Sequence, residues 1–190
     1  MDGTTGSPTN DPGQAVFAAG GGWCAIAWSL EGVTLLTLPF PDESSALDTL
    51  ASKGLPSRGG SLPSSIASLT ESVRQYMAGG DVDLSGIRVD LSGLPPFRRK
   101  VCEYVRTIPP GQIRTYGQVA AAVGSPGAAR AVGGAMAGNP VPLLVPCHRV
   151  VGANGEMVGF SAPGGTRTKR ALLEMERGTS TDCLKFVTAK

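Results

Sequence analysis

The chain has 190 residues, 41% of them hydrophobic, and a formal net charge of +2 at pH 7. This length and apolar content suit one or two small domains with their own cores, and no stretch is long and apolar enough to predict a membrane span. The near-neutral total conceals an uneven division, because residues 1–94 carry four Lys or Arg against ten Asp or Glu, whereas residues 95–177 carry eleven against four. The second half is therefore predicted to meet a polyanion, with a solvated basic face as the alternative.

Residues 1–14 are rich in Gly, Ser, Thr, Pro and Asp and lack the basic start and apolar run of a signal peptide. We expect a flexible tail there and a cytoplasmic protein. The only histidine is His148, and the four cysteines are Cys24, Cys102, Cys147 and Cys183. Since there is no CxxC pair and no second histidine, we expect reduced thiols and no metal.

Apolar segments separated by glycine-rich turns predict an α/β domain over residues 15–92, which opens with a hairpin or meander. The expected elements are strands Ala15–Ala19, Cys24–Ser29 and Val33–Leu38, helices Ser44–Lys53 and Ile66–Ala78, and a strand Asp81–Leu91. Ser44 or Ser45 is predicted to cap the first helix, and Gly79 with Gly80 to end the second.

Residues 93–178 are predicted to form a mainly helical domain with a helix-turn-helix, followed by a tail over residues 179–190. The expected helices are Phe97–Thr107, Tyr116–Val123 and Ala128–Ala137, with Thr115 as an N-cap and Gly124–Gly127 as the turn. In the second helix of the pair only Arg130 could reach base edges, which argues against reading a base sequence. Gly133 and Gly134 either let the backbone approach DNA closely or allow tight packing inside the domain.

The strongest chemical signal is Pro146-Cys147-His148-Arg149, which follows the apolar run Val141–Val145. The run predicts a buried extended segment, and Pro146 favours a bend at the cysteine. A thiol near an imidazole is a candidate nucleophile, because a neighbouring base raises the thiolate population. Neighbouring side chains of a strand point to opposite faces, so His148 would need a bend or a bridging water to reach Cys147. A small buried hydrophobe beside an ordinary polar residue is the alternative.

Several segments of the second half resemble the O6-alkylguanine-DNA alkyltransferases, also called methylated-DNA–protein-cysteine S-methyltransferases. The segments are Pro109–Ala120, Arg130–Val151 with its Pro-Cys-His-Arg core, Gly159–Ser161 and Lys169–Glu176. The resemblance is close over residues 94–178 and general over residues 15–90. It implies a ribonuclease-H-like α/β first domain and a mainly α second domain with a helix-turn-helix.

The resemblance also implies direct DNA repair without a cofactor. The alkyl group of O6-alkylguanine, and of O4-alkylthymine, would pass irreversibly to Cys147, once per molecule, after the base is flipped out of the duplex. The partner would be double-stranded DNA, bound in the minor groove by a monomer with little sequence preference and in a salt-sensitive way. Cooperative binding along the DNA is left open.

Each site residue takes a role from this resemblance. The catalytic residues would be Cys147 as nucleophile, His148 as its base through water, Glu176 as the orienter of the imidazole, Asn139 as support for the bend and the thiolate, and Tyr116 as a hydroxyl donor to the departing guanine. The DNA-binding residues would be Thr115, Tyr116, Ala128, Ala129, Gly133, Met136 and Arg130, whose side chain fills the place of the flipped base. Pro140 and Phe160 would wall the base pocket, with backbone groups of Val150 and Ser161 facing the base edge.

Ordinary alternatives accompany these roles. Tyr116 could be a half-buried helix residue, and Glu176 a solvated position for which Glu174 competes. A lesion sensor would lack the acceptor cysteine, so Cys147 argues against that class. A transcriptional regulator would need more base-reading side chains, and a cysteine hydrolase would need an oxyanion motif that is not recognisable here.

Overall fold

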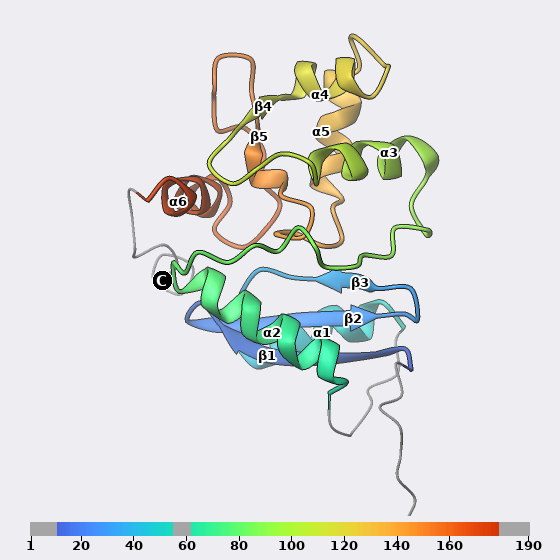
Figure 1. Cartoon of the computed structure of the whole chain (residues 1–190), viewed down its shortest axis with the longest axis vertical. Coiled ribbons are helices and arrows are strands. Elements are labelled where there is room, and N and C mark those ends of the chain that lie inside the picture. The colour runs from blue at the N-terminus through green and yellow to red at the C-terminus, as the bar shows by residue number, and fades with distance from the viewer. Residues whose placement is uncertain (1–10, 55–61, 179–190) are drawn as a thin grey trace, which may run out of the picture.

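The computed structural model describes residues 11–54 and 62–178. The first half opens with the strands β1 Gly13–Ala19, β2 Gly22–Trp28 and β3 Val33–Leu36, which form an antiparallel sheet in the order β1-β2-β3 (Figure 1). The predicted meander is therefore confirmed. The predicted tail over residues 1–14 is too long, because Gly13 and Gln14 already pair with Trp28 and Ala27. Residues 1–10 of that tail, the tail over residues 179–190 and Cys183 lie outside the described residues.

The alternation of side chains along the strands gives the sheet two apolar faces. Ala25, Ala27 and Leu35 pack on helix α1 Glu43–Ser52, whereas Cys24, Ile26 and Leu36 belong to the core shared with helix α2 Ser64–Met77. The cap of α1 differs from the prediction. Asp42 caps this helix by accepting the Ser45 N–H at 2.8 Å, and Ser44 and Ser45 lie inside the first turn, where their hydroxyls donate to the same carboxylate.

The predicted strand Asp81–Leu91 is wrong. Asp83 and Asp90 accept the N–H groups two residues ahead, at Ser85 and Ser92, with distances of 2.8 and 3.0 Å. Such local side-chain hydrogen bonds hold the backbone in turns rather than in a ladder. An isolated β-bridge between Val89 and Val33 joins this segment to β3.

The second half contains the helices α3 Pro96–Val105, α4 Tyr116–Ala122, α5 Ala129–Ala137 and α6 Thr166–Glu176. Its other elements are a parallel pair of two-residue strands, β4 Arg114–Thr115 and β5 Val150–Val151, and the 3₁₀ turn η1 Cys147–Arg149. The predicted helix–turn–helix is present as α4 and α5. Thr115 caps α4 in a reciprocal capping box with Gln118, and Gly124 and Gly127 take the left-handed conformations that the turn between the helices requires.

The apolar run before the cysteine is not the extended segment that its composition predicts. Val145 donates its N–H to the carbonyl of Val141 at 2.8 Å, and Leu143 has a φ of 72°, so the run folds into a tight turn. Asn139 holds both ends of this turn: its amide nitrogen donates to the Val145 carbonyl at 2.8 Å, and its amide oxygen accepts the Val141 N–H at 3.0 Å. The predicted bend at Cys147 is confirmed as the start of η1.

The two halves share one continuous apolar core, which includes residues of the sheet, α2, α3, α5 and α6. A backbone hydrogen bond of 2.9 Å, from Leu36 of β3 to the carbonyl of Pro140, also joins them. Among the described residues, no helix has the length and apolar content needed to span a bilayer.

Candidate active site

Cys147 begins η1 and lines a pocket of about 740 Å³ that opens between α4, α5 and the loop 153–161. The turn held by Asn139 delivers the cysteine to this place, and the residue is only 6% exposed. The described residues that line the pocket include Thr115, Tyr116, Ala129, Arg130, Gly133, Met136, Phe160 and Ser161. The structure thus brings the cysteine together with most of the residues predicted to bind DNA or the base.

Two predicted pocket residues lie elsewhere. The carbonyl of Pro140 accepts from the N–H of Leu36 in the first half, and Val150 is fully buried in β5, where it pairs with Arg114. Neither belongs to the described lining of the pocket. Ser161 does line it, and its hydroxyl donates to the carbonyl of Ala137 at 2.9 Å, which ties the loop to the end of α5.

The thiol of Cys147 needs a base to ionise. Burial raises its pKa, and the Asn139 amide, the Lys169 ammonium and the backbone N–H groups of Cys147 and His148 oppose that effect only in part. The thiol is therefore neutral at neutral pH, and its ionisation requires a proton acceptor.

His148, the residue after Cys147, has its imidazole held by a buried carboxylate. Its Nε2 lies 2.8 Å from Oε1 of Glu176, and the two side chains are 1% and 2% exposed. Burial lowers the pKa of His148, although the Glu176 carboxylate opposes this, so the imidazole is neutral at neutral pH. An ionised carboxylate accepts the Nε2 proton, which leaves Nδ1 as the basic nitrogen. Nδ1 is buried and has no hydrogen-bond partner among the described residues.

The Glu176 carboxylate is the most heavily bonded group of the site. Arg149 approaches it with Nε at 3.1 Å from both oxygens and Nη2 at 2.6 Å from Oε1, and the N–H of Gly111 donates to Oε2 at 2.9 Å. Burial alone would raise the pKa of Glu176, but hydrogen bonds from His148, Arg149 and Tyr76 lower it below its ordinary value. Glu176 rather than its exposed neighbour Glu174 therefore meets His148.

Lys169 is a site residue that the sequence interpretation missed. Its side chain is fully buried in α6, and its ammonium donates to the Val158 carbonyl at 3.1 Å and to the Tyr116 hydroxyl at 3.4 Å. The same ammonium stands 5.6 Å from the centre of the Tyr116 ring. Burial lowers the pKa of Lys169, and the negative charge of an ionised Cys147 opposes that shift.

A signal for Lys169 existed in the sequence. Lys169, Leu172 and Glu176 recur at helical spacing, so a lysine stands on the apolar face of α6 together with the carboxylate. Arg149 and Tyr76 were missed as well. Arg149 stands inside the Pro-Cys-His-Arg motif, and Tyr76 continues the apolar face of α2 after Leu69 and Val73.

The helix–turn–helix presents a surface of small residues with one exposed cation, Arg130 of α5. A Cβ added to Gly133 or Gly134 would meet no atom within 4 Å, so these glycines are not required for packing inside the domain. Ala128 is the N-cap residue of α5 and packs half-buried against the core, whereas Ala129 lines the pocket.

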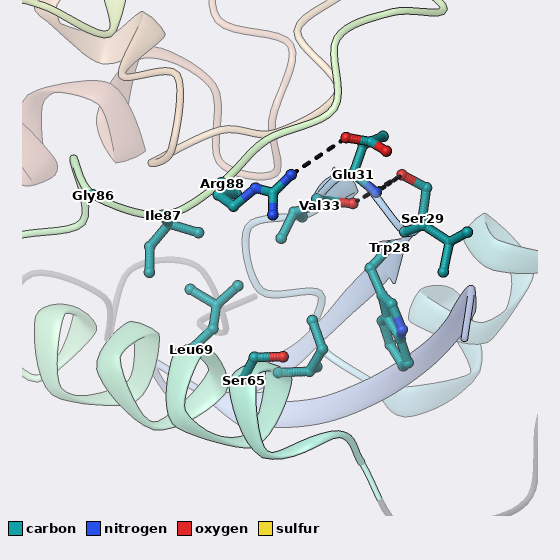
Figure 2. A pocket seen from close by; sticks show the side chains of 12 residues that line it. Trp28, Ser29, Glu31, Val33, Ser65, Leu69, Gly86, Ile87 and Arg88 are labelled. Carbon is teal, nitrogen blue, oxygen red and sulfur yellow. Dashed lines mark hydrogen bonds and ion pairs between the residues drawn. The ribbon is translucent and has the colours of Figure 1, made fainter. Parts of the chain in front are cut away.

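Other features of the described chain lie apart from this site. A pocket of about 210 Å³ in the first half lies between β2, α2 and the segment around Ile87, with an ion pair of 3.3 Å between Arg88 and Glu31 at its edge (Figure 2). Burial raises the pKa of the Cys24 thiol to about 12 and that of Cys102 to about 11, and both cysteines are free. No group of three or more His, Cys, Asp or Glu gathers in the described ranges in a way that could hold a metal ion.

The site combines a buried thiol with an adjacent imidazole–carboxylate pair, in a pocket between the helices of a helix-turn-helix. This combination defines the class of protein, one that carries out cysteine chemistry beside a DNA-binding motif. Residues 96–178 match the family described as 6-O-methylguanine DNA methyltransferase, DNA binding domain. The methylated-DNA–protein-cysteine methyltransferase of Mycobacterium leprae is 45% identical over 124 residues, which are 64% of this chain and 73% of that protein.

Solved structures agree with the sequence comparison. The Mycobacterium tuberculosis O6-methylguanine methyltransferase superposes with a TM-score of 0.69 at 31% identity, covering 90% of this chain and 95% of its own. A structure of Mycobacterium tuberculosis OGT in complex with DNA superposes with a TM-score of 0.69 at 33% identity. The match covers 91% of this chain and 98% of that chain. The chain belongs to the methylated-DNA–protein-cysteine methyltransferase family, a family of DNA-repair alkyltransferases with a mixed α/β fold.

Proposed function

We propose that the protein repairs DNA by moving the alkyl group of O6-alkylguanine to the sulfur of Cys147. The observation that carries the proposal is the position of Cys147, which lies in the pocket between α4 and α5 with the buried His148–Glu176 pair beside it. The family to which the chain belongs supports the same reaction.

In the proposed reaction the thiol proton passes to Nδ1 of His148, through a water molecule, and Glu176 stabilises the imidazolium that forms. The sulfur attacks the alkyl carbon in line, so that a sulfur–carbon bond forms while the bond from that carbon to O6 breaks. Tyr116 donates from its hydroxyl to a ring nitrogen of guanine, which leaves as a neutral base. Lys169 stabilises the thiolate and holds the Tyr116 hydroxyl at 3.4 Å.

The product is a thioether at Cys147, and no group in the proposed mechanism cleaves it again. Each molecule is therefore proposed to act once and to need no cofactor. O4-alkylthymine presents the same alkyl–oxygen bond on a smaller ring, and we propose it as a second substrate. A pocket of about 740 Å³ is large enough for either base.

The target base lies inside a duplex, so the protein must rotate it out of the stack, at a cost of a few kcal/mol. We propose that α5 docks in the minor groove, since its Gly133 and Gly134 leave open space for a close approach, and that Arg130 fills the vacated position. Binding of this kind depends on phosphates and groove shape, so it is expected to be salt-sensitive and largely independent of sequence.

For the molecule as a whole we propose two domains over residues 15–92 and 93–178, the first of them ribonuclease-H-like, and a cytoplasmic monomer. The three-stranded antiparallel sheet with helices on both faces supports the first domain. The capped helix pair α4 and α5 supports the second.

Peptide mass spectrometry after reaction with a duplex that contains O6-methylguanine tests the proposal. We expect a single added methyl group on the peptide that carries Cys147, and none in Cys147→Ser. Cys102→Ser is the matched control, because Cys102 is also a buried free thiol and is expected to leave the transfer intact. Tight binding of the lesion without any gain of mass would overturn the proposal in favour of a damage sensor.

A further inference from the structure

The hydroxyl of Tyr76, in the first half of the chain, reaches the carboxylate that orients the proposed base. Tyr76 lies near the end of α2, is 5% exposed, and donates to Oε1 of Glu176 at 2.6 Å across 100 residues of sequence. We propose that Tyr76 is a positioning residue for alkyl transfer, and that the first domain thereby completes the site by controlling how strongly Glu176 holds His148. The inference rests on the alkyl-transfer function proposed above.

Three hydrogen-bond donors converge on Oε1 of Glu176. This single oxygen receives Tyr76 at 2.6 Å, His148 at 2.8 Å and Nη2 of Arg149 at 2.6 Å. A carboxylate oxygen has two lone pairs, so three donors share its negative charge and each weakens the others. The Tyr76 hydroxyl therefore competes directly with the imidazole N–H.

The charges around Glu176 make this competition matter for proton transfer. Burial and the charge of Glu176 raise the pKa of Tyr76, so its hydroxyl keeps its proton and is always a donor. Arg149 is permanently charged, which leaves His148 as the group in contact with Glu176 that changes protonation state. Two further charges act on the network from neighbouring segments: the Lys169 ammonium of α6 opposes protonation of His148, and Asp83, which follows α2, interacts with Arg149.

Removing the hydroxyl has a definite expected direction. In Tyr76→Phe the carboxylate keeps more of its negative charge for His148, which stabilises the imidazolium and raises the pKa of the imidazole. The carboxylate also loses one of the contacts that fix its orientation. At neutral pH, less of the protein then has a neutral imidazole in the correct position.

The experiment follows His148 directly, because it is the only histidine in the chain and gives one imidazole signal in an NMR titration. In Tyr76→Phe we expect the midpoint of that titration to rise by about half a pH unit or more. On the acid limb of the pH–rate profile, the single-turnover rate of methyl transfer from an O6-methylguanine duplex is expected to fall by about 3-fold or more, because the rise of the midpoint lowers the fraction of neutral His148 by that factor.

Tyr104→Phe is the matched control. Tyr104 of α3 also packs half-buried against the core, and its hydroxyl makes no hydrogen bond within the described part of the chain. The same chemical change at position 104 is expected to leave the His148 titration and the rate as in the wild type. A Tyr76→Phe protein with the wild-type titration midpoint and pH–rate profile would show that Tyr76 only fills space, and would overturn the inference.

Two further outcomes are decisive. If Tyr76→Phe does not fold, 3-fluorotyrosine is incorporated at position 76 only, which makes the hydroxyl a stronger hydrogen-bond donor. The midpoint of the His148 titration must then fall, and an unchanged midpoint overturns the inference. If the wild-type protein does not transfer methyl at all, the proposed function fails, and the proposed role of Tyr76 in transfer fails with it. The coupling of Tyr76 to His148 would still be visible in the titration, so the two failures are distinguishable.

Discussion

Glu176→Gln is expected to damage both the stability and the reaction of this protein. The Glu176 side chain is 2% exposed and accepts hydrogen bonds from His148, Arg149 and Tyr76. A glutamine puts an NH₂ donor where one carboxylate oxygen accepted, so at least one of these donors loses its partner. The buried Arg149 guanidinium also loses its counter-charge.

The magnitude follows from these contacts. Breaking a buried ion pair by removing one partner costs about 3–5 kcal/mol of unfolding free energy. For a chain of this size, where about 1 kcal/mol moves the melting temperature by about 2–4 °C, the melting temperature should fall by about 6–20 °C. Loss of the group that sets the tautomer and orientation of His148 should slow alkyl transfer by about 10²- to 10⁴-fold.

Thermal unfolding and single-turnover methyl transfer measure the two effects. Glu174→Gln is the matched control, because Glu174 lies exposed on the same helix two residues away. That change should alter the unfolding free energy by less than about 0.5 kcal/mol. A Glu176→Gln protein with wild-type stability and rate would exclude this role of the Glu176 carboxylate, and so would equal losses in the two variants.

Further predictions concern pH, the buried lysine and the glycines of α5. Because the pKa values of His148 and Glu176 in the folded protein lie below their ordinary values of 6.5 and 4.5, the unfolded chain binds more protons. The free energy of unfolding, measured by urea denaturation, should thus fall as the pH drops below about 6.5 and fall further below about 4.5. A constant free energy of unfolding over this range would contradict the burial of a neutral imidazole. Lys169→Met removes the ammonium that lowers the Cys147 pKa, so the rate of thiol alkylation by iodoacetamide at neutral pH should fall by about 10-fold, and an unchanged rate would exclude this electrostatic role. Gly133→Ala adds a methyl group into open space on a helix, so the free energy of unfolding should rise by about 0.5–1 kcal/mol while affinity for an undamaged duplex falls. Fluorescence anisotropy measures that affinity, and higher stability with unchanged affinity would contradict docking through α5.

Local sequence signals predicted those parts of the structure that depend on neighbouring residues. Thr115 with Gln118 three residues later is sufficient to start α4, and the glycines at 124 and 127 supply the left-handed turn before α5. The bend at Cys147 followed from Pro146 in the same way. In each case the residues that fix the backbone lie within one turn of each other.

Features that depend on distant contacts could not be predicted in this way. Val141–Val145 has the composition of a strand, and it becomes a tight turn because the Asn139 side chain takes the backbone hydrogen bonds that a neighbouring strand would have supplied. The approach of Tyr76 to Glu176 joins residues 100 positions apart, and no periodicity in either helix indicates the other partner. The burial of Lys169 was visible as a lysine on an apolar helix face, but its neighbours Tyr116 and Val158 become evident only after folding.

In the proposed mechanism, Cys147 accepts one alkyl group and is not regenerated. Intact-mass measurement of the protein with increasing excess of an O6-methylguanine duplex distinguishes this single use from turnover. The mechanism predicts that the gain in mass saturates at one methyl group per molecule and that the number of repaired guanines equals the number of protein molecules. Repair that continues beyond one guanine per protein, or saturating methylation in Cys147→Ser, would contradict it.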